Sequence, residues 1–193
     1  ASGEILLECA GNHRALHFGL LGSGLWSGVP VSEILEKAAP ASEWVLIEGF
    51  DHHSLPSTNS EAGCSWIFRR RDLDASGALL ATRFNDAPLT PDHGSPVRLV
   101  IPGWYACCSV KWVTNIEMVE DDHPATSQMK EFAARTHQSD VLERAADFRP
   151  ATIERSALPI RVEKWRVDGA IRYRVVGLDW GGDRSRGQLQ IRF

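Results

Sequence analysis

The run Glu4-Ile5-Leu6-Leu7-Glu8-Cys9-Ala10-Gly11-Asn12-His13-Arg14 carries the strongest local signal in the chain. Its first half is a short apolar run that predicts a mostly buried strand, and the Gly-Asn pair marks the turn that ends it. Cys9 therefore stands at a strand end, where a thiol can face a cleft. Arg14 follows closely and would favour the thiolate, the form that is nucleophilic and binds metals. Because a free cysteine is often only a small buried hydrophobe, the spacing alone leaves that role open for Cys9.

Outward from this run, strand-like and helical patterns alternate. Four segments have the composition of strands: 44–48, 78–84, 97–101 and 110–119. Asn85-Asp86 predicts a tight turn, since both residues tolerate positive φ. Residues 30–39 have helical spacing with proline in the first turn. The stretch from 49 to 77, with Arg69, Arg70 and Arg71 in its middle, is polar and predicted to be irregular. The patterns indicate an α+β fold.

The pattern changes at about residue 121. Residues 121–157 are predicted to form a connecting segment that is helical in part. Residues 158–193 return to strand-like composition, with a turn at Asp168-Gly169. Because three strands with exposed edges rarely form a stable unit alone, we expect them to be the start of a truncated all-β domain. The predicted organisation is an α+β domain over 1–120, a connection, and part of a second domain.

Composition excludes several classes of protein. The 193 residues are 43% apolar and 24% charged, which fits a globular protein rather than a disordered or collagen-like one. The net charge of −4 argues against a dedicated nucleic-acid binder. No apolar stretch approaches the roughly 20 residues that a membrane span needs. The four cysteines do not predict a disulfide scaffold, and no signal peptide is recognisable, so the sequence itself does not indicate a compartment.

A second cluster places three cationic residues near one another in the predicted fold. His93 precedes a strand, Arg98 lies in it, and Lys111 opens the next strand after a Pro-Gly turn. Side chains on loops and strand ends could converge on one polyanion through charge-assisted hydrogen bonds. The alternative is three unrelated surface cations. A zinc site at Cys107 and Cys108 is not favoured, because the ligand spacing of such sites is missing.

Together these motifs resemble the sulfite oxidase family of molybdopterin enzymes. The matching motifs occur in the order of the family: Cys-Ala-Gly-Asn-x-Arg at 9–14, Asp-His-Gly-x-Pro-x-Arg at 92–98, Pro-Gly-Trp-Tyr at 102–105 and Ser-Val-Lys-Trp at 109–112. The resemblance covers roughly residues 4–119. It implies a sulfite-oxidase-like molybdopterin-binding domain of mixed sheets with short helices that lacks its N-terminal part, followed by the start of the family's immunoglobulin-like dimerisation domain.

The resemblance also implies roles for individual residues. Cys9 matches the thiolate that binds molybdenum beside the dithiolene sulfurs of the cofactor, and Arg14 matches an arginine of the oxyanion pocket. The positions that hold the pterin and its phosphate correspond to Asp51, His93, Arg98, Ser109, Val110 and Lys111. Thr82 stands where the family pattern Leu-Leu-Ala-Tyr-Glu-x-Asn places a pocket tyrosine. A threonine hydroxyl reaches less far than that of tyrosine, so we expect a wider pocket or another residue in its place.

The function implied by the resemblance is that of a molybdenum-molybdopterin oxidoreductase that catalyses oxygen-atom transfer. Sulfite or a related sulfur oxyanion is the first expected substrate. Two alternatives are the same cofactor with a sulfane sulfur species or nitrate, and a non-catalytic subunit that binds the cofactor or a partner. The implied partners are a small oxyanion, an external electron acceptor such as a cytochrome, and a second copy of the chain in a homodimer. The resemblance favours a periplasmic location.

Overall fold

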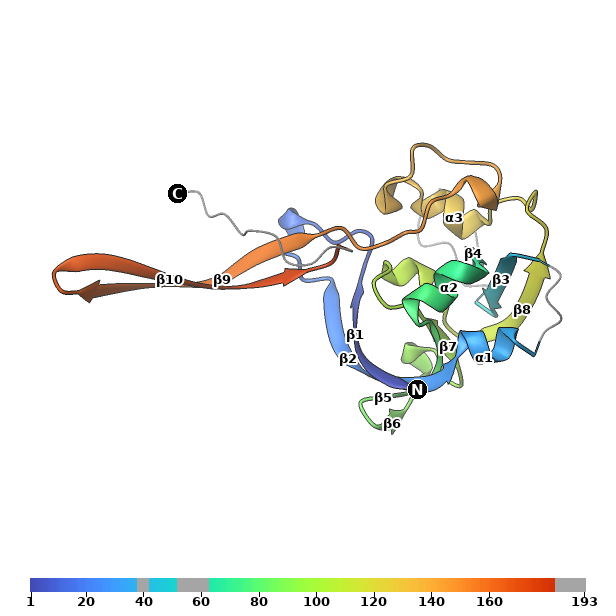
Figure 1. The fold of residues 1–193 in the computed structure, drawn as a ribbon, viewed down its shortest axis with the longest axis horizontal. Coiled ribbons are helices and arrows are strands. Elements are labelled where there is room, and N and C mark those ends of the chain that lie inside the picture. The colour runs from blue at the N-terminus through green and yellow to red at the C-terminus, as the bar shows by residue number, and fades with distance from the viewer. Residues whose placement is uncertain (38–41, 52–62, 183–193) are drawn as a thin grey trace. The chain divides into compact units, whose positions relative to one another are not determined.

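The computed structural model describes residues 1–37, 42–51 and 63–182, which fall into two compact units. The first unit runs from Ala1 to Ala151 and the second begins at Thr152. In the first unit, two antiparallel sheets are combined with short helices (Figure 1). This arrangement confirms the predicted α+β class, in which sheets are combined with short helices.

The larger sheet has five strands. β1 (Ser2–Glu8) pairs with β2 (Leu21–Pro30), and β2 pairs with β5 (Leu79–Phe84). The far edge of β5 pairs with both β6 (Ala87–Pro88) and β7 (Arg98–Val100). The side chains buried on this sheet form one apolar cluster: Ile5, Trp26, Leu79, Ala81, Leu89 and Val100.

The predicted turn between β5 and β6 is confirmed. Asn85 and Asp86 have φ angles of 48° and 61°, which these two residue types tolerate better than most. The Asn85 side chain also accepts a hydrogen bond from the Leu25 backbone N–H at 2.9 Å. The turn is therefore tied to the adjoining strand β2 as well as closing its own hairpin.

The smaller sheet has three strands, in the order β4 (Cys64–Arg69), β3 (Trp44–Gly49) and β8 (Val113–Val119). Residues 44–47 of its central strand are all buried, so both faces of the strand are covered. α3 (Ser127–Phe132) lies beside β4, and α1 (Val31–Leu35) lies beside α2 (Arg70–Ser76) (Figure 1). The main apolar core of the first unit is built around this sheet.

Helices in the described part of the chain are short. The longest, α2, has seven residues, and five single turns of 3-10 helix occur at Arg14–Leu16, Pro91–His93, Ala106–Cys108, Ala134–Thr136 and Ala145–Asp147. None of the described helices is long and apolar enough to cross a membrane.

The prediction of irregular structure from 49 to 77 is wrong for residues 64–76, and residues 52–62 of this stretch lie outside the described residues. This stretch includes the whole of β4 and α2, which ends where Gly77 adopts a left-handed φ of 68°. Three consecutive arginines suggested a solvated loop, but the Arg69 guanidinium lies 4.8 Å from the Trp44 ring centre and donates to the Ala146 carbonyl at 3.3 Å. Stacking on an aromatic face lets a cation end a buried strand.

Two predicted boundaries also differ from the structure. The helix predicted for residues 30–39 covers only Val31–Leu35 as a regular helix, because Pro30 is still paired as the last residue of β2. Residues 38–39 lie outside the described residues. The strand predicted from Val110 starts at Val113, since Trp112 has a positive φ that interrupts extended backbone.

Residues beyond 120 continue to build the first unit up to Ala151. Met129, Ala133, Phe148 and Ala151 are buried in the main core, and α3 packs beside β4. The part of the suggested connecting segment before residue 152 is therefore an integral layer over the smaller sheet.

The second unit is described as far as residue 182 and consists of one antiparallel hairpin. β9 (Ser156–Val167) and β10 (Ala170–Trp180) are joined by Asp168-Gly169, with φ angles of 50° and 78°. Positive φ at both turn residues matches the right-handed twist of the flanking strands. The strand-like pattern and the turn predicted here are thus confirmed, whereas the last part of the predicted all-β segment, residues 183–193, lies outside the described residues. That the hairpin begins an immunoglobulin-like domain stays a prediction.

A close backbone approach between β2 and β5 gives the first testable prediction. A Cβ atom on Gly28 would lie 2.0 Å from the Leu80 carbonyl oxygen, whereas one on Gly22 of the same strand would meet nothing within 4 Å. Overpacking of this kind typically costs about 1–3 kcal/mol. Gly28→Ala should therefore lower the free energy of unfolding in urea by that amount, and Gly22→Ala should change it by less than about 0.5 kcal/mol. Equal urea midpoints for the two variants would contradict the packing of β2 on β5.

Candidate functional site

Arg98 is a buried cation at the centre of the first unit. It is only 5% exposed, and burial lowers its pKa to about 10, so the guanidinium stays charged at neutral pH. It donates to three main-chain carbonyl oxygens, those of Ser109 at 3.0 Å, His93 at 3.3 Å and Leu99 at 3.4 Å. Its guanidinium carbon lies 5.1 Å from the ring centre of Trp26. A buried charge is stable only when it is hydrogen-bonded or paired, and here its hydrogen bonds go to neutral groups.

Lys111 supplies a second, partly buried cation nearby. Its Nζ donates to the Asp92 carbonyl oxygen at 2.5 Å and lies 5.3 Å from the ring centre of Trp112. Its pKa is lowered, first by burial and then by the positive charge of Arg98. Because burial and the neighbouring positive charge both disfavour the charged form of Lys111, an anion bound between the two cations would stabilise it.

The turn at residues 91–94 is held against both cations. Trp112 Nε1 donates to the Pro91 carbonyl at 2.9 Å, Lys111 donates to that of Asp92, and Arg98 donates to that of His93. Three successive carbonyls thus accept from three donors on two other segments. Gly94 has φ 93°, and a Cβ there would lie 3.0 Å from Lys111 Cβ and 3.1 Å from Arg98 Cβ. A glycine at this position lets the turn approach both residues.

Arg98 and Lys111 line one cavity of about 390 Å³. Its other lining residues come from several segments: Leu7, Asp51, Cys64, Ala106, Cys107, Ser109, Trp112 and Gln128. A second cavity of about 200 Å³ shares Leu7 and Arg98 with the first and is also lined by Gly22, Ser23, Trp26, Phe84 and His93. The His93 ring stacks on Phe84 with 5.2 Å between ring centres. Arg98 therefore borders two adjoining hollows, one of them beside Lys111 and the other beside His93.

These cavities bring together most of the predicted pterin ligands. Asp51, Arg98, Ser109 and Lys111 line the larger cavity, and His93 lines the smaller one. Val110 is buried and does not line either cavity. Its N–H donates to the Cys108 carbonyl and its carbonyl accepts the Leu99 N–H, so its backbone fixes the segment that carries Ser109 and Lys111. The convergence of the three cations on one region is what the sequence suggested.

The residues predicted to lie beside the metal are outside the lining of both cavities. Cys9 follows the last residue of β1, and its Sγ accepts the Gly11 backbone N–H at 3.4 Å. Arg14 is exposed in the adjoining 3-10 turn. Thr82 is exposed on β5 at the point where the β2–β5 register shifts, between the pairs Ser27–Arg83 and Gly28–Ala81. Such a bulge points a side chain away from the regular alternation of the strand.

The turn around Cys9 is fixed by a small hydrogen-bond network. Asn12 Nδ2 donates to Glu8 Oε1 at 2.8 Å, and Asn12 Oδ1 accepts the Leu20 N–H at 3.0 Å. The Cys9 backbone N–H donates to the Leu20 carbonyl at 2.9 Å. The predicted strand end is thus confirmed, and the Gly-Asn pair closes the turn that presents the thiol.

Several residues that line the larger cavity were not predicted from the sequence. Cys64 is one of them, and burial is the main cause of the raised pKa of its thiol. Gln128 reaches the cavity from α3, where its amide nitrogen donates to the Cys107 carbonyl at 2.9 Å. Cys64 was not predicted as a site residue because β4 itself was not predicted. Gln128 was not predicted because residues 121–157 were expected to form a connecting segment. The signal in the sequence for Gln128 was its place as a polar residue directly before the apolar face of the helix.

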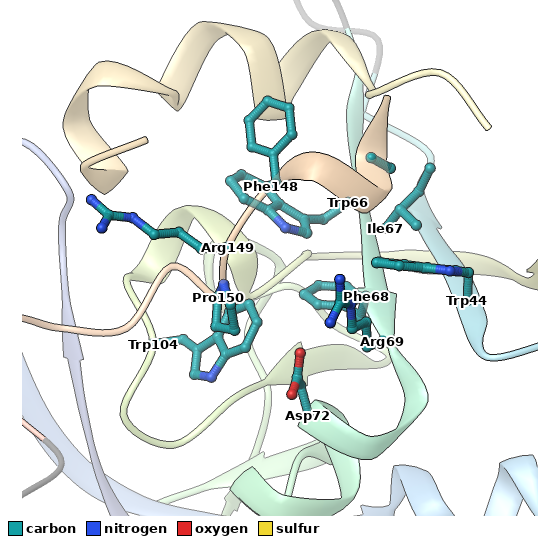
Figure 2. A pocket seen from close by; sticks show the side chains of 11 residues that line it. Trp44, Trp66, Ile67, Phe68, Arg69, Asp72, Trp104, Phe148, Arg149 and Pro150 are labelled. Carbon is teal, nitrogen blue, oxygen red and sulfur yellow. The ribbon is translucent and has the colours of Figure 1, made fainter. Parts of the chain in front are cut away.

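A third, much smaller void lies among aromatic rings of the main core. Figure 2 shows the rings of Trp66, Phe68, Trp104 and Phe148 around it, with Arg69 nearby. Its volume of about 10 Å³ is close to the least that can hold one water molecule. It is a packing gap rather than a ligand site.

The two cations give a prediction for anion binding. Lys111→Met should weaken the binding of inorganic phosphate about tenfold, since a hydrogen bond to a charged group is lost. Lys164→Met, an exposed lysine on β9, should leave the dissociation constant unchanged. Because the protonated amine binds the anion and its pKa is lowered, wild-type affinity should fall with rising pH below 10.5, the ordinary value. Calorimetric titration across this range checks both expectations; a Lys111→Met protein with the wild-type pH profile would refute the assignment.

Comparisons with known proteins agree with this geometry. The model of the family "Oxidoreductase molybdopterin binding domain" matches residues 2–127. The mitochondrial sulfite oxidase of Drosophila melanogaster is 34% identical over 125 residues, covering 61% of this chain and 21% of that protein. An NADPH nitrate reductase of Beauveria bassiana is 31% identical over 131 residues, covering 61% and 14%.

A solved structure, that of the sulfane dehydrogenase SoxCD from Paracoccus pantotrophus, superposes with a TM-score of 0.50 at 28% identity. The match covers 60% of this chain and 31% of that one, so the chain spans less than a third of each of these three proteins. Because the family model covers more than half of the chain and includes every motif quoted above, the chain belongs to the family of oxidoreductase molybdopterin-binding domains.

Proposed function

We propose that this chain is the cofactor-binding part of a molybdenum-molybdopterin oxidoreductase that catalyses oxygen-atom transfer, with sulfite or a related sulfur oxyanion as substrate. The observation that carries the proposal is the buried Arg98 guanidinium beside Lys111 in a cavity of about 390 Å³. Molybdopterin bears a phosphate, and two partly desolvated cations bind phosphate more strongly than cations in bulk water would.

The residues around the two cavities fit this cofactor chemically. Arg98, Lys111 and His93 would hold the phosphate and the polar edge of the pterin, with Asp51 accepting hydrogen bonds from its ring N–H groups. Ser109 Oγ already accepts the Ile101 N–H at 3.3 Å, and its own hydrogen is left to donate. The chain thus offers hydrogen-bond donors for the anionic phosphate and a carboxylate that can accept from the N–H groups of the pterin.

Cys9 would provide the single protein ligand to the metal. The Gly11 N–H donates to its sulfur at 3.4 Å and so helps to fix the position of the thiol at the strand end. When bound, the cofactor supplies the redox chemistry, and the protein supplies position and charge. Arg14, five residues further on, would attract the oxyanion substrate from its exposed turn.

The choice of substrate rests on the similar proteins. Two of them are a sulfite oxidase and a sulfane dehydrogenase, which favours a sulfur substrate for this chain. Nitrate is the second candidate, because nitrate reductases match the chain at about the same identity. An external electron acceptor such as a cytochrome would complete the reaction, and a periplasmic location stays a prediction.

Turnover assays separate these candidates. The protein should be produced in a host that makes molybdopterin and assayed with sulfite, thiosulfate or nitrate and a matching artificial electron acceptor or donor. We expect sulfite oxidation to exceed both other activities. Cofactor content without any turnover would instead identify a non-catalytic binding subunit.

The control for this experiment is Cys9→Ser. Turnover should fall at least a hundredfold, whereas pterin content should stay within about threefold, because the phosphate contacts are unchanged. Cys64→Ser is the matched variant at a cavity thiol and should keep its molybdenum. Undiminished activity in Cys9→Ser would remove this cysteine from the metal site.

We also propose that the protein is a homodimer through the hairpin of the second unit. One face of the hairpin presents Val162, Ile171 and Tyr173, which are 49–58% exposed, and the opposite face bears charged pairs such as Arg161–Glu163. The first face also carries Lys164 and Arg166, and the opposite face also exposes Trp165 and Val167. Exposed apolar side chains on the hairpin favour association. Ile171→Lys should shift the protein from dimer to monomer in sedimentation at micromolar concentration, and Arg172→Lys on the other face should not. A wild-type protein that sediments as a monomer would exclude the proposed dimer.

A further inference from the structure

Trp112 has an unusual backbone conformation beside the cation cavity. Its φ angle is 50°, in the left-handed region that bulky side chains rarely adopt. It lies between Lys111 and the first residue of β8, and its side chain lines the larger cavity. A strained conformation persists only where surrounding contacts enforce it, and such residues cluster at functional sites.

The contacts that enforce it come from two separate segments. From the turn before β7, the Pro91 carbonyl accepts the Trp112 Nε1–H at 2.9 Å. From the end of β3, the Phe50 ring lies 5.6 Å from the Trp112 ring between centres, and the Phe50 N–H donates to the Trp112 carbonyl at 3.2 Å. Trp112 is therefore held by a hydrogen bond from its indole N–H, by a ring contact and by a hydrogen bond to its backbone carbonyl.

This conformation controls where Lys111 can lie. The ammonium group sits 5.3 Å from the centre of the Trp112 ring and donates to the Asp92 carbonyl, next to the carbonyl that binds the indole. The Lys111 backbone is confined as well, since a Cβ on Gly49 would lie 2.1 Å from its carbonyl oxygen. Lys111 is thus fixed through its backbone by β3 and through its side chain by the indole.

We propose that Trp112 is a positioning residue that fixes the Lys111 ammonium opposite Arg98 and thereby sets the affinity of the cavity for a phosphate group. The inference rests on the proposed function, in which this cavity holds the phosphate of the cofactor. It adds that the indole acts through Lys111 rather than by touching the anion: the cation–π contact and the shared turn hold the ammonium in place.

The test is a calorimetric titration that measures the binding of inorganic phosphate to the cofactor-free protein. Trp112→Asn keeps a residue that tolerates positive φ but removes the indole. Trp112→Phe keeps a ring and removes the N–H. Trp165→Asn, at an exposed tryptophan of β9, is the matched control. We expect the dissociation constant to rise about tenfold for Trp112→Asn, about threefold for Trp112→Phe, and less than twofold for the control.

A double-mutant cycle with Lys111→Met separates positioning from a structural role. If the indole acts through Lys111, adding Trp112→Asn to Lys111→Met should weaken binding no further. A full additional loss in that background would overturn the proposal, as would wild-type affinity in both Trp112 variants. Should Trp112→Asn not fold, Trp112→Phe alone and in the Lys111→Met background gives the same comparison.

The outcome for the proposed function can be read separately. Wild-type protein that binds no phosphate, together with a Lys111→Met protein that keeps full molybdenum content in a molybdopterin-producing host, would refute both the cavity assignment and this inference. Wild-type binding that is lost in Lys111→Met but unchanged in the Trp112 variants would refute only the role of Trp112.

Discussion

The burial of the Arg98 charge is the constraint on which the site depends. Transferring a guanidinium out of water is costly unless its N–H groups find acceptors, and three of the five N–H groups of Arg98 donate to the carbonyls of Ser109, His93 and Leu99. These carbonyl oxygens are neutral, so the hydrogen bonds leave the net positive charge in place. The fold therefore holds a preorganised cation beside a cavity, which an anion can neutralise without rearrangement of the protein.

Holding that charge brings two loops together. The 91–94 turn supplies a carbonyl to Arg98, and its neighbouring carbonyls accept from Lys111 and Trp112. This close approach needs glycine at 94, and it accompanies the left-handed backbone of Trp112, which costs about 1–2 kcal/mol for a residue with a Cβ. Gly94 and the strained Trp112 both flank the cations, so at Trp112 local stability is lost where charge is placed.

The sequence predicted the parts of this arrangement that depend on local pattern. The strand ending at Cys9, the Asn85-Asp86 turn and the hairpin around Asp168-Gly169 follow from short-range periodicity and turn chemistry. β4 could not be predicted in this way, because its end at Arg69 depends on the Trp44 ring of another strand. Cys64 and Gln128 were missed for the same reason: their place in the cavity is set by packing between segments distant in sequence. Arg98 and Lys111 could be predicted because residue type and motif can be read from the sequence. The other residues that line the cavity could not, because their positions depend on the folded structure.

The division between the cation cavities and the Cys9 turn bears on substrate choice. The same span of this chain matches a sulfite oxidase and nitrate reductases at 31–34% identity, although these proteins are named for different substrates. Under the proposed function, the Arg98–Lys111 cavity binds the cofactor, and this role does not depend on which substrate is used. In this chain the exposed Arg14 turn and the Thr82 bulge lie outside the cavity lining, so they can vary without disturbing the buried charge. Under the proposed function, specificity can therefore change at these positions without altering the cavity that would hold the cofactor.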